Sequence, residues 1–326
     1  MANGNGTGSA AIEIDRLTKW FGSTCAVNEL SFSVRKGEAL GFIGPNGAGK
    51  TTTMRILATL DEPDLGDAFV DGFSCTNDPD SVRKRLGFMP DAYGAYHNVS
   101  CVEYLDFFAR SYGLKGRERT RAVNRVLDFT HMHHMMDKPT TGLSKGMKQR
   151  LCLGRTMIHD PQVLILDEPA AGLDPRARIE LKEMINRLLT EGKTLLISSH
   201  ILTELAEMCS RVAIIEHGNL LAVGSVQEIL NKFTGEMASD SEDNLTTVIV
   251  RFLGESQPLF DFLAAKELRN LRLIGDLIEF AIRDDENWRA DFLADLIRNK
   301  FRISAFATKE RSLEEAFMRA TQGRVQ

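Results

Sequence analysis

The chain has 326 residues, of which 43% are hydrophobic and 26% are charged, and its formal net charge is −5. These values are typical of a soluble globular protein with room for two domains, and they argue against a protein whose whole surface binds nucleic acid. No window approaches the roughly 18 to 20 apolar residues that a membrane-spanning helix requires, so a role at a membrane would need a partner.

The chain begins with ten residues, MANGNGTGSA, that have neither a basic start nor an apolar stretch. They predict a disordered tail rather than a signal peptide. From about residue 11 to 235 short apolar runs alternate with helical stretches, the pattern of an α/β layer fold. Runs rich in Leu, Ile and Val predict buried strands with polar chemistry at their carboxyl ends, at residues 38–44, 162–167, 193–200 and 211–218.

A polar, acidic segment at residues 236–244 predicts a linker, and the pattern changes after it. Residues 245–326 predict a strand, a helix, two strands, a helix and a strand. This βαββαβ order is the ferredoxin-like arrangement, an α+β fold. A capping box of Ser312 and Glu315 predicts a last helix. No catalytic constellation is evident in this second domain, so a structural or regulatory role is expected for it.

The first chemical motif is GPNGAGKT, which matches G-x-x-x-x-G-K-[ST] between a predicted strand and a predicted helix. Such a loop directs backbone N–H groups and a helix N-terminus at phosphates, and a glycine-rich turn without a ligand is disfavoured by this context. Lys50 is expected to reach the β- and γ-phosphates of ATP, Thr51 to bind Mg²⁺, and Thr52 to hydrogen-bond an α-phosphate oxygen. The expected ATP-binding residues of this segment are Gly44, Pro45, Asn46, Gly47, Ala48, Gly49, Lys50, Thr51 and Thr52.

The second motif is VLILDEP, residues 163–169, which places two carboxylates at the end of an apolar strand. Burying such a pair without a cation is costly. Asp167 is the expected partner for Mg²⁺, through water, and Glu168 is positioned to take a proton from an attacking water. The alternative is a pair of acidic residues that face solvent. Lys50 and Thr51 favour the first interpretation, because they supply the other half of a site.

With these motifs on the chain, the segment LSKGMKQR, residues 143–150, resembles the signature of the ATP-binding subunits of ABC transporters. The resemblance covers nearly all of residues 12–235 and implies a P-loop ABC-type ATPase domain within residues 11–235. In that family two subunits pack head to tail. Ser144 and Gly146 would then offer a hydroxyl and backbone donors to the γ-phosphate bound by the partner subunit. Taken alone, Ser144 would be an ordinary helix N-cap.

Two residues of this segment depart from the commonest signature, LSGGQ. Lys145 stands at a glycine position and Met147 at the glutamine position. Ser144 and Gly146 are retained, so recognition through them is still expected, whereas a contact made by the missing glutamine side chain is not.

Three smaller features fit the same family. The segment AGLD, residues 171–174, resembles the loop that couples the two ATP sites, and Asp174 is also a plausible N-cap. His200 matches the histidine that contacts the γ-phosphate, although a lone histidine at a strand end is more often structural. Phe21 stands where the family stacks an aromatic ring on adenine, with a core position for Phe21, or Trp20 as the stacking ring, as alternatives.

A further comparison concerns Asp91, which follows LGFMP where the family usually has a glutamine that binds Mg²⁺ and contacts the permease. A carboxylate is also a good ligand for Mg²⁺. The hypothesis is that Asp91 keeps the metal role, and the alternative is a turn residue that faces solvent.

The segment HMHHMMD is the one other candidate metal site. Its histidines, His131, His133 and His134, lack a cysteine partner and the i, i+4 spacing that puts two ligands on one helical face. A surface turn is the preferred interpretation.

The resemblance implies a Mg²⁺-dependent ATPase that closes as a dimer on ATP and drives a separately encoded integral membrane permease. The dimer would be a homodimer at the cytoplasmic face of the membrane, and five scattered cysteines without a C-x-x-C pair fit a reducing cytosol. The C-terminal domain resembles that of drug and multidrug exporters. One alternative is an ABC ATPase acting on ribosomes or DNA, but the first type carries two ATPase domains in tandem and the second a long coiled-coil insertion, and this sequence has neither. The other is a P-loop kinase, which would not need a signature.

Overall fold

The computed structural model describes residues 10–91, 98–201, 205, 207–229, 245–266, 268–283 and 286–308. These residues form two compact units, the first ending at residue 229 and the second lying within 245–308. No helix in the described ranges is long and apolar enough to cross a membrane. Residues 1–9 of the predicted tail, the predicted linker and the helix predicted from Ser312 lie outside the described residues. Ala10, which the sequence placed in the tail, instead begins the first strand.

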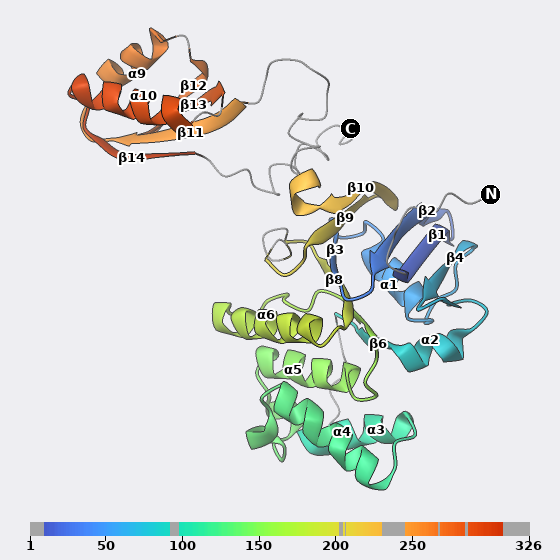
Figure 1. Ribbon diagram of the computed structural model, residues 1–326. Coiled ribbons are helices and arrows are strands. Elements are labelled where there is room, and N and C mark those ends of the chain that lie inside the picture. The colour runs from blue at the N-terminus through green and yellow to red at the C-terminus, as the bar shows by residue number, and fades with distance from the viewer. Residues whose placement is uncertain are drawn as a thin grey trace. The chain divides into compact units, whose positions relative to one another are not determined.

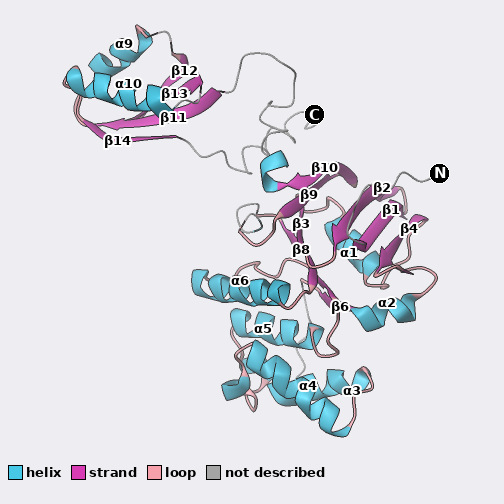
Figure 2. Cartoon of the chain, in the orientation of Figure 1, coloured by secondary structure: helices cyan, strands magenta, loops and turns pink. Residues whose placement is uncertain are grey.

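Six strands form the main sheet of the first unit (Figures 1 and 2). In sheet order they are β10 (Asn219–Ser225), β9 (Arg211–Glu216), β3 (Ala39–Ile43), β8 (Thr194–Ser199), β7 (Val163–Leu166) and β6 (Leu86–Met89). All neighbours run parallel except β10 and β9. The predicted buried strands are confirmed as β3, β7, β8 and β9. Because β3, β7 and β8 are parallel, the polar residues that follow them lie at one edge of the sheet.

A second, antiparallel sheet was not predicted. In sheet order it contains β2 (Thr24–Arg35), β1 (Ala10–Phe21), β4 (Leu65–Val70) and β5 (Phe73–Ser74). β1 and β2 form a long hairpin with several register shifts, and these shifts interrupt the regular alternation by which such strands are recognised. The helix α1 (Lys50–Leu57) lies between the two sheets (Figure 1). Its buried side chains belong to a single hydrophobic core that also contains residues of both sheets.

The other labelled helices of the first unit lie on both sides of the main sheet (Figure 1): the first of them packs beside the antiparallel sheet, and the later ones lie mainly on the opposite side. They are α2 (Pro79–Arg85), α3 (Cys101–Ser111), α4 (Gly116–Phe129), α5 (Lys145–Thr156) and α6 (Pro175–Thr190), with the short 3-10 helices η1 (His133–Met135) and η2 (Thr140–Gly142). Helix α3 begins at a capping box formed by Ser100 and Glu103, which satisfies two backbone N–H groups. Helices α3, α4 and α5 pack against one another.

The second unit has the predicted order of elements. Its described elements are β11 (Leu245–Phe252), α9 (Ser256–Ala264), β12 (Arg269–Ile274), β13 (Leu277–Arg283), α10 (Glu286–Arg298) and β14 (Ile303–Thr308). The sheet order is β12-β13-β11-β14 and all pairs are antiparallel. Alternate residues such as Val248 and Val250 of β11 are buried with residues of both helices, so the two helices cover one face of the sheet.

A histidine after α5 is held in its neutral form by its surroundings. The His159 ring stacks on Tyr112, with centroids 3.8 Å apart and planes 7° from parallel. Its Nε2 atom donates to the Leu86 carbonyl oxygen at 3.1 Å, and Nδ1 is buried without a partner in the described part of the chain. Burial lowers the pKa of His159 to about 4, although the bond to Leu86 and the charge of Asp160 act in the opposite direction.

This histidine predicts a loss of stability in mild acid. Its folded pKa of about 4 lies below the ordinary value of 6.5, so the unfolded chain binds more protons between these pH values. Lowering the pH from 6.5 towards 4 should therefore remove on the order of 2 kcal/mol from the free energy of unfolding through this group. Urea unfolding at pH 7 and pH 5 measures the loss. His159→Phe keeps a ring on Tyr112 and should reduce the pH dependence, whereas His131→Phe at an exposed position should not. Equal pH dependence in wild type and His159→Phe would contradict the assignment.

Candidate ATP site

The loop between β3 and α1 is a tight turn that only glycine permits at two positions. A Cβ atom on Gly44 would collide with the backbone carbonyl of Ile215, and one on Gly49 would collide with the carbonyl of Ala26. Gly49 also has a φ of 104°, which L side chains rarely adopt. Pro45, Asn46 and Gly47 are exposed, whereas Ala48 is buried and bonded to Gly218. The predicted strand, loop and helix are confirmed.

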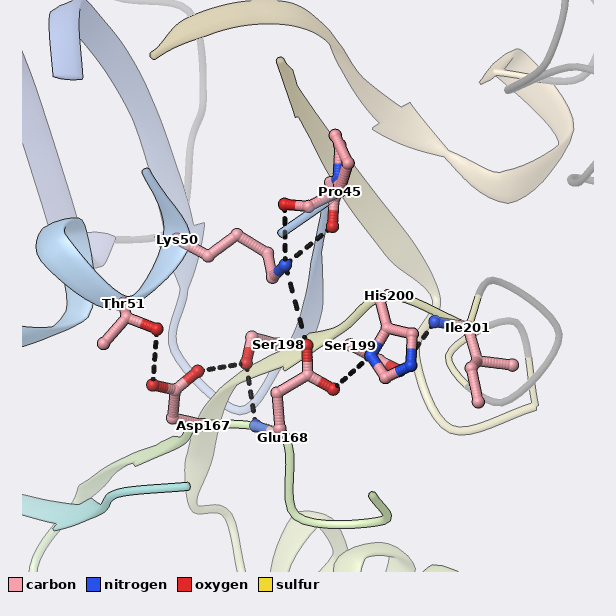
Figure 3. Close-up of polar contacts among 10 residues, drawn as sticks. Pro45, Lys50, Thr51, Asp167, Glu168, Ser198, Ser199, His200 and Ile201 are labelled. Carbon is pink, nitrogen blue, oxygen red and sulfur yellow. Dashed lines mark hydrogen bonds and ion pairs between the residues drawn. The ribbon is translucent and has the colours of Figure 1, made fainter. Parts of the chain in front are cut away.

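Lys50, the first residue of α1, turns its side chain back into this loop (Figure 3). Its Nζ atom donates to the carbonyl oxygen of Gly44 at 2.6 Å and to that of Pro45 at 3.3 Å. The same atom lies 3.6 Å from Glu168 Oε1. Lys50 is 6% exposed, so the loop encloses a nearly buried ammonium group beside the N-terminus of a helix. This is an arrangement that favours anions such as phosphates.

Asp167 follows β7 and is 1% exposed. Its Oδ2 atom accepts a hydrogen bond from Thr51 Oγ1 at 2.9 Å, and its Oδ1 atom accepts one from Ser198 Oγ at 2.6 Å (Figure 3). The backbone N–H of Asp167 donates to the Met89 carbonyl of β6, which continues the sheet by one residue. Both carboxylate oxygens are therefore satisfied, as burial of an acidic group requires.

Glu168 joins the two halves of the site. Its Oε1 atom faces Lys50, and its Oε2 atom lies 2.8 Å from Nδ1 of His200, just beyond β8. The backbone N–H of Glu168 donates to Ser198 Oγ at 2.8 Å. Glu168 has a φ of 49°, a left-handed conformation that is uncommon for residues other than glycine. The chain thus turns sharply after Asp167, and the Glu168 carboxylate points towards Lys50 and His200 (Figure 3).

Ser198 is a site residue that the sequence motifs did not predict. The motif LLISSH drew attention to its histidine alone. In the structure Leu166 pairs with Ile197 in parallel register, so the next residues along the two strands, Asp167 and Ser198, are neighbours. Ser198 is 0% exposed and bonds to both acidic residues of the site. No signal along the chain separates Ser198 from Thr194 and Ser199, the other buried polar residues of β8, because only the pairing of β7 with β8 places it beside Asp167.

The aromatic residues at the end of β1 are both exposed. Phe21 is 53% exposed and pairs with Thr24 across the hairpin. Trp20 is 40% exposed and pairs with Cys25. The alternative that placed Phe21 in the core is therefore wrong. Either ring remains accessible for stacking on a base, and the Lys19 ammonium lies 5.7 Å from the Phe21 centroid.

The signature segment and the AGLD loop lie side by side at the N-termini of α5 and α6. Ser144 caps α5 by accepting from Met147 N at 3.3 Å, and Asp174 caps α6 by accepting from Ala177 N at 2.8 Å, so both predicted N-caps are confirmed. A Cβ atom on Gly146 would approach the Ala177 Cβ to 3.0 Å, which explains the glycine by close helix packing. The side chains of Ser144 and Asp174 are exposed.

Two further contacts link these elements. Arg150 of α5 forms an ion pair with Glu180 of α6. The Lys145 ammonium occupies the space into which a side chain at Gly172 would project, so the residue that departs from the common signature touches the AGLD loop. In the described ranges, Ser144, Gly146 and Asp174 make no hydrogen bond to Lys50 or Glu168 of their own chain.

The remaining predicted metal ligand and the histidine segment are at the surface. Asp91 lies in an exposed bend after Pro90, and its carboxylate makes no hydrogen bond or ion pair with another described residue. His131 is exposed in the turn before η1 and His133 is exposed as the first residue of η1, with its Nδ1 atom 3.2 Å from Asp128 Oδ1. The predicted surface turn is confirmed, whereas a role for Asp91 remains a prediction.

The donor atoms around Asp167 fit Mg²⁺. Thr51 Oγ1 and Asp167 Oδ2, 2.9 Å apart, are a hydroxyl and a carboxylate oxygen, which are ligands that this ion prefers. No group of three His, Cys, Asp or Glu side chains that could hold a metal occurs in the part of the chain that the structure describes. Mg²⁺ commonly uses one or two protein oxygens together with substrate phosphates and water, so two ligands beside the phosphate-binding loop suffice.

Comparisons with known proteins agree with this geometry. The protein family described as "ABC transporter" matches residues 27–171. The Nod factor export ATP-binding protein I of Ralstonia nicotianae is 31% identical over 319 residues, which cover 98% of this chain and 96% of that protein. The probable multidrug ABC transporter ATP-binding protein YbhF of Escherichia coli is 35% identical over 222 residues, covering 68% of this chain and 38% of that protein.

A solved structure, an ATP-binding subunit of an ABC transporter, aligns with a TM-score of 0.63 and 29% identity over 70% of this chain and 95% of that one. The Ralstonia relative matches over almost the full length of both chains, and the structure encloses Lys50 beside the cluster of Thr51, Asp167 and Glu168. The chain belongs to the family of ATP-binding subunits of ABC transporters.

Proposed function

We propose that this chain, an ATP-hydrolysing subunit of an ABC transporter, binds ATP at the loop 44–52 and powers export by a separate membrane permease. The observation that carries the proposal is the convergence of Lys50, Thr51, Asp167 and Glu168 at the carboxyl edge of one parallel sheet, with His200 beside Glu168. A phosphate bound by backbone N–H groups of the loop would receive the Lys50 ammonium in place of its present carbonyl partners.

The same residues support a mechanism of hydrolysis. When bound, Mg²⁺ neutralises charge on the β- and γ-phosphates, and Thr51 and Asp167 are the residues that would hold it. Glu168 would accept a proton from the attacking water, because its carboxylate lies 3.6 Å from the Lys50 ammonium that is proposed to hold the phosphate. His200 donates to Glu168 Oε2 from Nδ1 and holds this carboxylate in place, and its Nε2 atom would contact the γ-phosphate.

A second copy of the chain completes the site in this proposal. Ser144, Gly146 and Asp174 lie together at two helix N-termini and do not bond to the Lys50 loop of their own chain. Exposed N-termini of this kind suit the γ-phosphate held by a partner subunit. Phe21 at the exposed end of β1 would stack on the adenine ring. The expected assembly is a homodimer that closes on ATP.

Export is proposed from the relatives. One is named for Nod factor export and another for a multidrug transporter, and the first matches across both units of this chain. The C-terminal unit, with its βαββαβ order and strand order β12-β13-β11-β14, supports a ferredoxin-like accessory or regulatory domain. Through its permease the chain would lie at the cytoplasmic face of the membrane.

Purification of the tagged full chain from detergent-solubilised membranes tests this function. An integral membrane protein should copurify, and the complex should hydrolyse ATP only with Mg²⁺. Recovery with ribosomes or DNA and without any membrane protein would favour the alternative, an ABC ATPase that acts without a permease. Identification of the copurifying protein would also narrow the exported substrate.

The metal role of Asp91 gives a separate prediction. If this carboxylate approaches Mg²⁺ in the closed state, Asp91→Ala should raise the Mg²⁺ concentration for half-maximal ATPase activity roughly tenfold. Asp80→Ala, which removes an exposed aspartate whose side chain pairs with Arg83, should leave it unchanged. ATPase assays over a range of Mg²⁺ concentrations make the comparison. Equal Mg²⁺ dependence in wild type and Asp91→Ala would leave Asp91 as a turn residue.

A further inference from the structure

Ser198 is a buried hydroxyl to which the mechanism above gives no role. It lies on β8, between β3 and β7, and is 0% exposed. The residues of the neighbouring strands are apolar, so a serine here places a polar atom in the core. The free-energy cost of burying the hydroxyl is offset because it both donates and accepts a hydrogen bond.

The two bonds of Ser198 reach two different residues with different roles. The hydroxyl donates to Asp167 Oδ1 at 2.6 Å and accepts from Glu168 N at 2.8 Å (Figure 3). With Oδ1 engaged by Ser198, the other oxygen, Oδ2, is the one turned to Thr51. A single hydroxyl therefore sets the rotation of the carboxylate that is proposed to hold Mg²⁺.

The second bond acts on the backbone of the proposed base. Glu168 has a left-handed φ of 49°, and such conformations persist where the surroundings impose them. The Ser198 hydroxyl holds the N–H of this residue, and His200, two residues farther along, holds its carboxylate at 2.8 Å. The end of β8 and the position after it thus supply two residues that hold Glu168, Ser198 at its backbone N–H and His200 at its carboxylate.

From these contacts we infer that Ser198 is a positioning residue that couples the placement of the metal ligand Asp167 to that of the base Glu168. The inference rests on the proposed function. Without the hydroxyl, the Asp167 carboxylate can rotate away from Thr51. The turn at Glu168 also loses the hydrogen bond that fixes the backbone nitrogen of Glu168. Metal affinity and turnover should then fall together, although the nucleotide contacts of Lys50 remain.

Ser198→Ala in the full chain tests the coupling. Mn²⁺, another divalent ion that takes oxygen ligands, is titrated into the ADP-loaded chain and free Mn²⁺ is measured by electron paramagnetic resonance. We expect the Mn²⁺ dissociation constant to rise roughly tenfold and kcat for ATP to fall roughly ten- to a hundredfold, the range found when partners of metal ligands are removed. Affinity for ADP without metal should stay within about twofold, because Lys50 and the loop are untouched. Ser198→Thr, which retains a hydroxyl, should recover most of both losses.

Ser74 provides a matched control. It is buried, its hydroxyl donates to Asp67 Oδ2 at 2.5 Å, and it accepts from the backbone N–H of Asn77 at 2.9 Å. Ser74→Ala therefore removes the same two kinds of bond outside the site, together with a third that the hydroxyl accepts from Asn77 Nδ2 at 3.1 Å. Thermal unfolding of both variants reports the stability that each loses, and Ser74→Ala should leave Mn²⁺ affinity and kcat unchanged.

The outcomes separate this inference from the function on which it rests. A Ser198→Ala chain that loses only stability, as Ser74→Ala does, and keeps wild-type Mn²⁺ affinity and kcat would overturn the positioning role. Loss of both quantities in Ser198→Thr as well as Ser198→Ala would also overturn it, because the hydroxyl would then not be the cause. A wild-type chain without Mg²⁺-dependent ATPase activity would instead contradict the proposed function.

Discussion

Glu168→Gln is expected to lower kcat for ATP hydrolysis roughly a hundred- to ten-thousandfold while ATP still binds. The amide retains the shape of the side chain and can keep a contact with His200, but it cannot accept a proton from water, and general base catalysis commonly contributes factors of this size. Because hydrolysis reopens the proposed dimer, the variant should accumulate as an ATP-bound dimer. Phosphate release gives the rate, and size-exclusion chromatography with and without ATP gives the assembly.

The control for this substitution is Glu38→Gln. Glu38 is also a glutamate in an ion pair, with Arg211 at 3.1 Å, but it lies at the opposite end of β3 from the loop. The Glu38→Gln chain should therefore hydrolyse ATP at the wild-type rate. Turnover of Glu168→Gln at the wild-type rate would show that another group accepts the proton. If Glu168→Gln lost ATP binding as well as ATP hydrolysis, Glu168 would instead have a role in binding, through its contact with Lys50.

Lys50→Ala is expected to weaken ATP binding roughly a hundredfold and to abolish measurable hydrolysis at ordinary ATP concentrations. Hydrogen bonds to charged groups contribute about 1.5–3 kcal/mol each, so the loss of an ammonium that reaches two phosphates produces an effect of at least this size. The substitution also removes the cation that faces Glu168. Fluorescence titration with a labelled ATP analogue measures the affinity directly.

Lys193→Ala is the control for Lys50→Ala. It shows how much of the effect comes from removing a buried charge and how much from the loss of ATP binding. Lys193 is 7% exposed, close to the 6% of Lys50, and its Nζ atom lies 2.8 Å from Asp160. Lys193→Ala should therefore lose stability and still bind ATP. If Lys50→Ala bound the analogue as tightly as Lys193→Ala does, the loop 44–52 would not be the phosphate site.

The sequence predicted the site in those places where chemistry depends on neighbours along the chain. Lys50 and Thr51 follow a glycine-rich turn, and Asp167 and Glu168 follow a buried strand, so strand, loop and helix order alone placed them at one sheet edge. The N-caps at Ser144 and Asp174 were likewise local, since each accepts from the residue three positions later. The antiparallel sheet of the hairpin 10–35 was missed because its register shifts disrupt the two-residue period.

What the sequence by itself determined is the identity of the chemical groups and the order of the elements that carry them, including the βαββαβ order of the second unit. The tertiary structure alone decided which distant residues meet: His200 with Glu168 across β7 and β8, Lys145 with Gly172, and Ser198 with Asp167. The physical reason is that motifs are set by bonding along the chain, whereas strand register and helix packing bring together residues that no local spacing connects. The dependence of Asp167 and Glu168 on one serine hydroxyl belongs to this second kind of information.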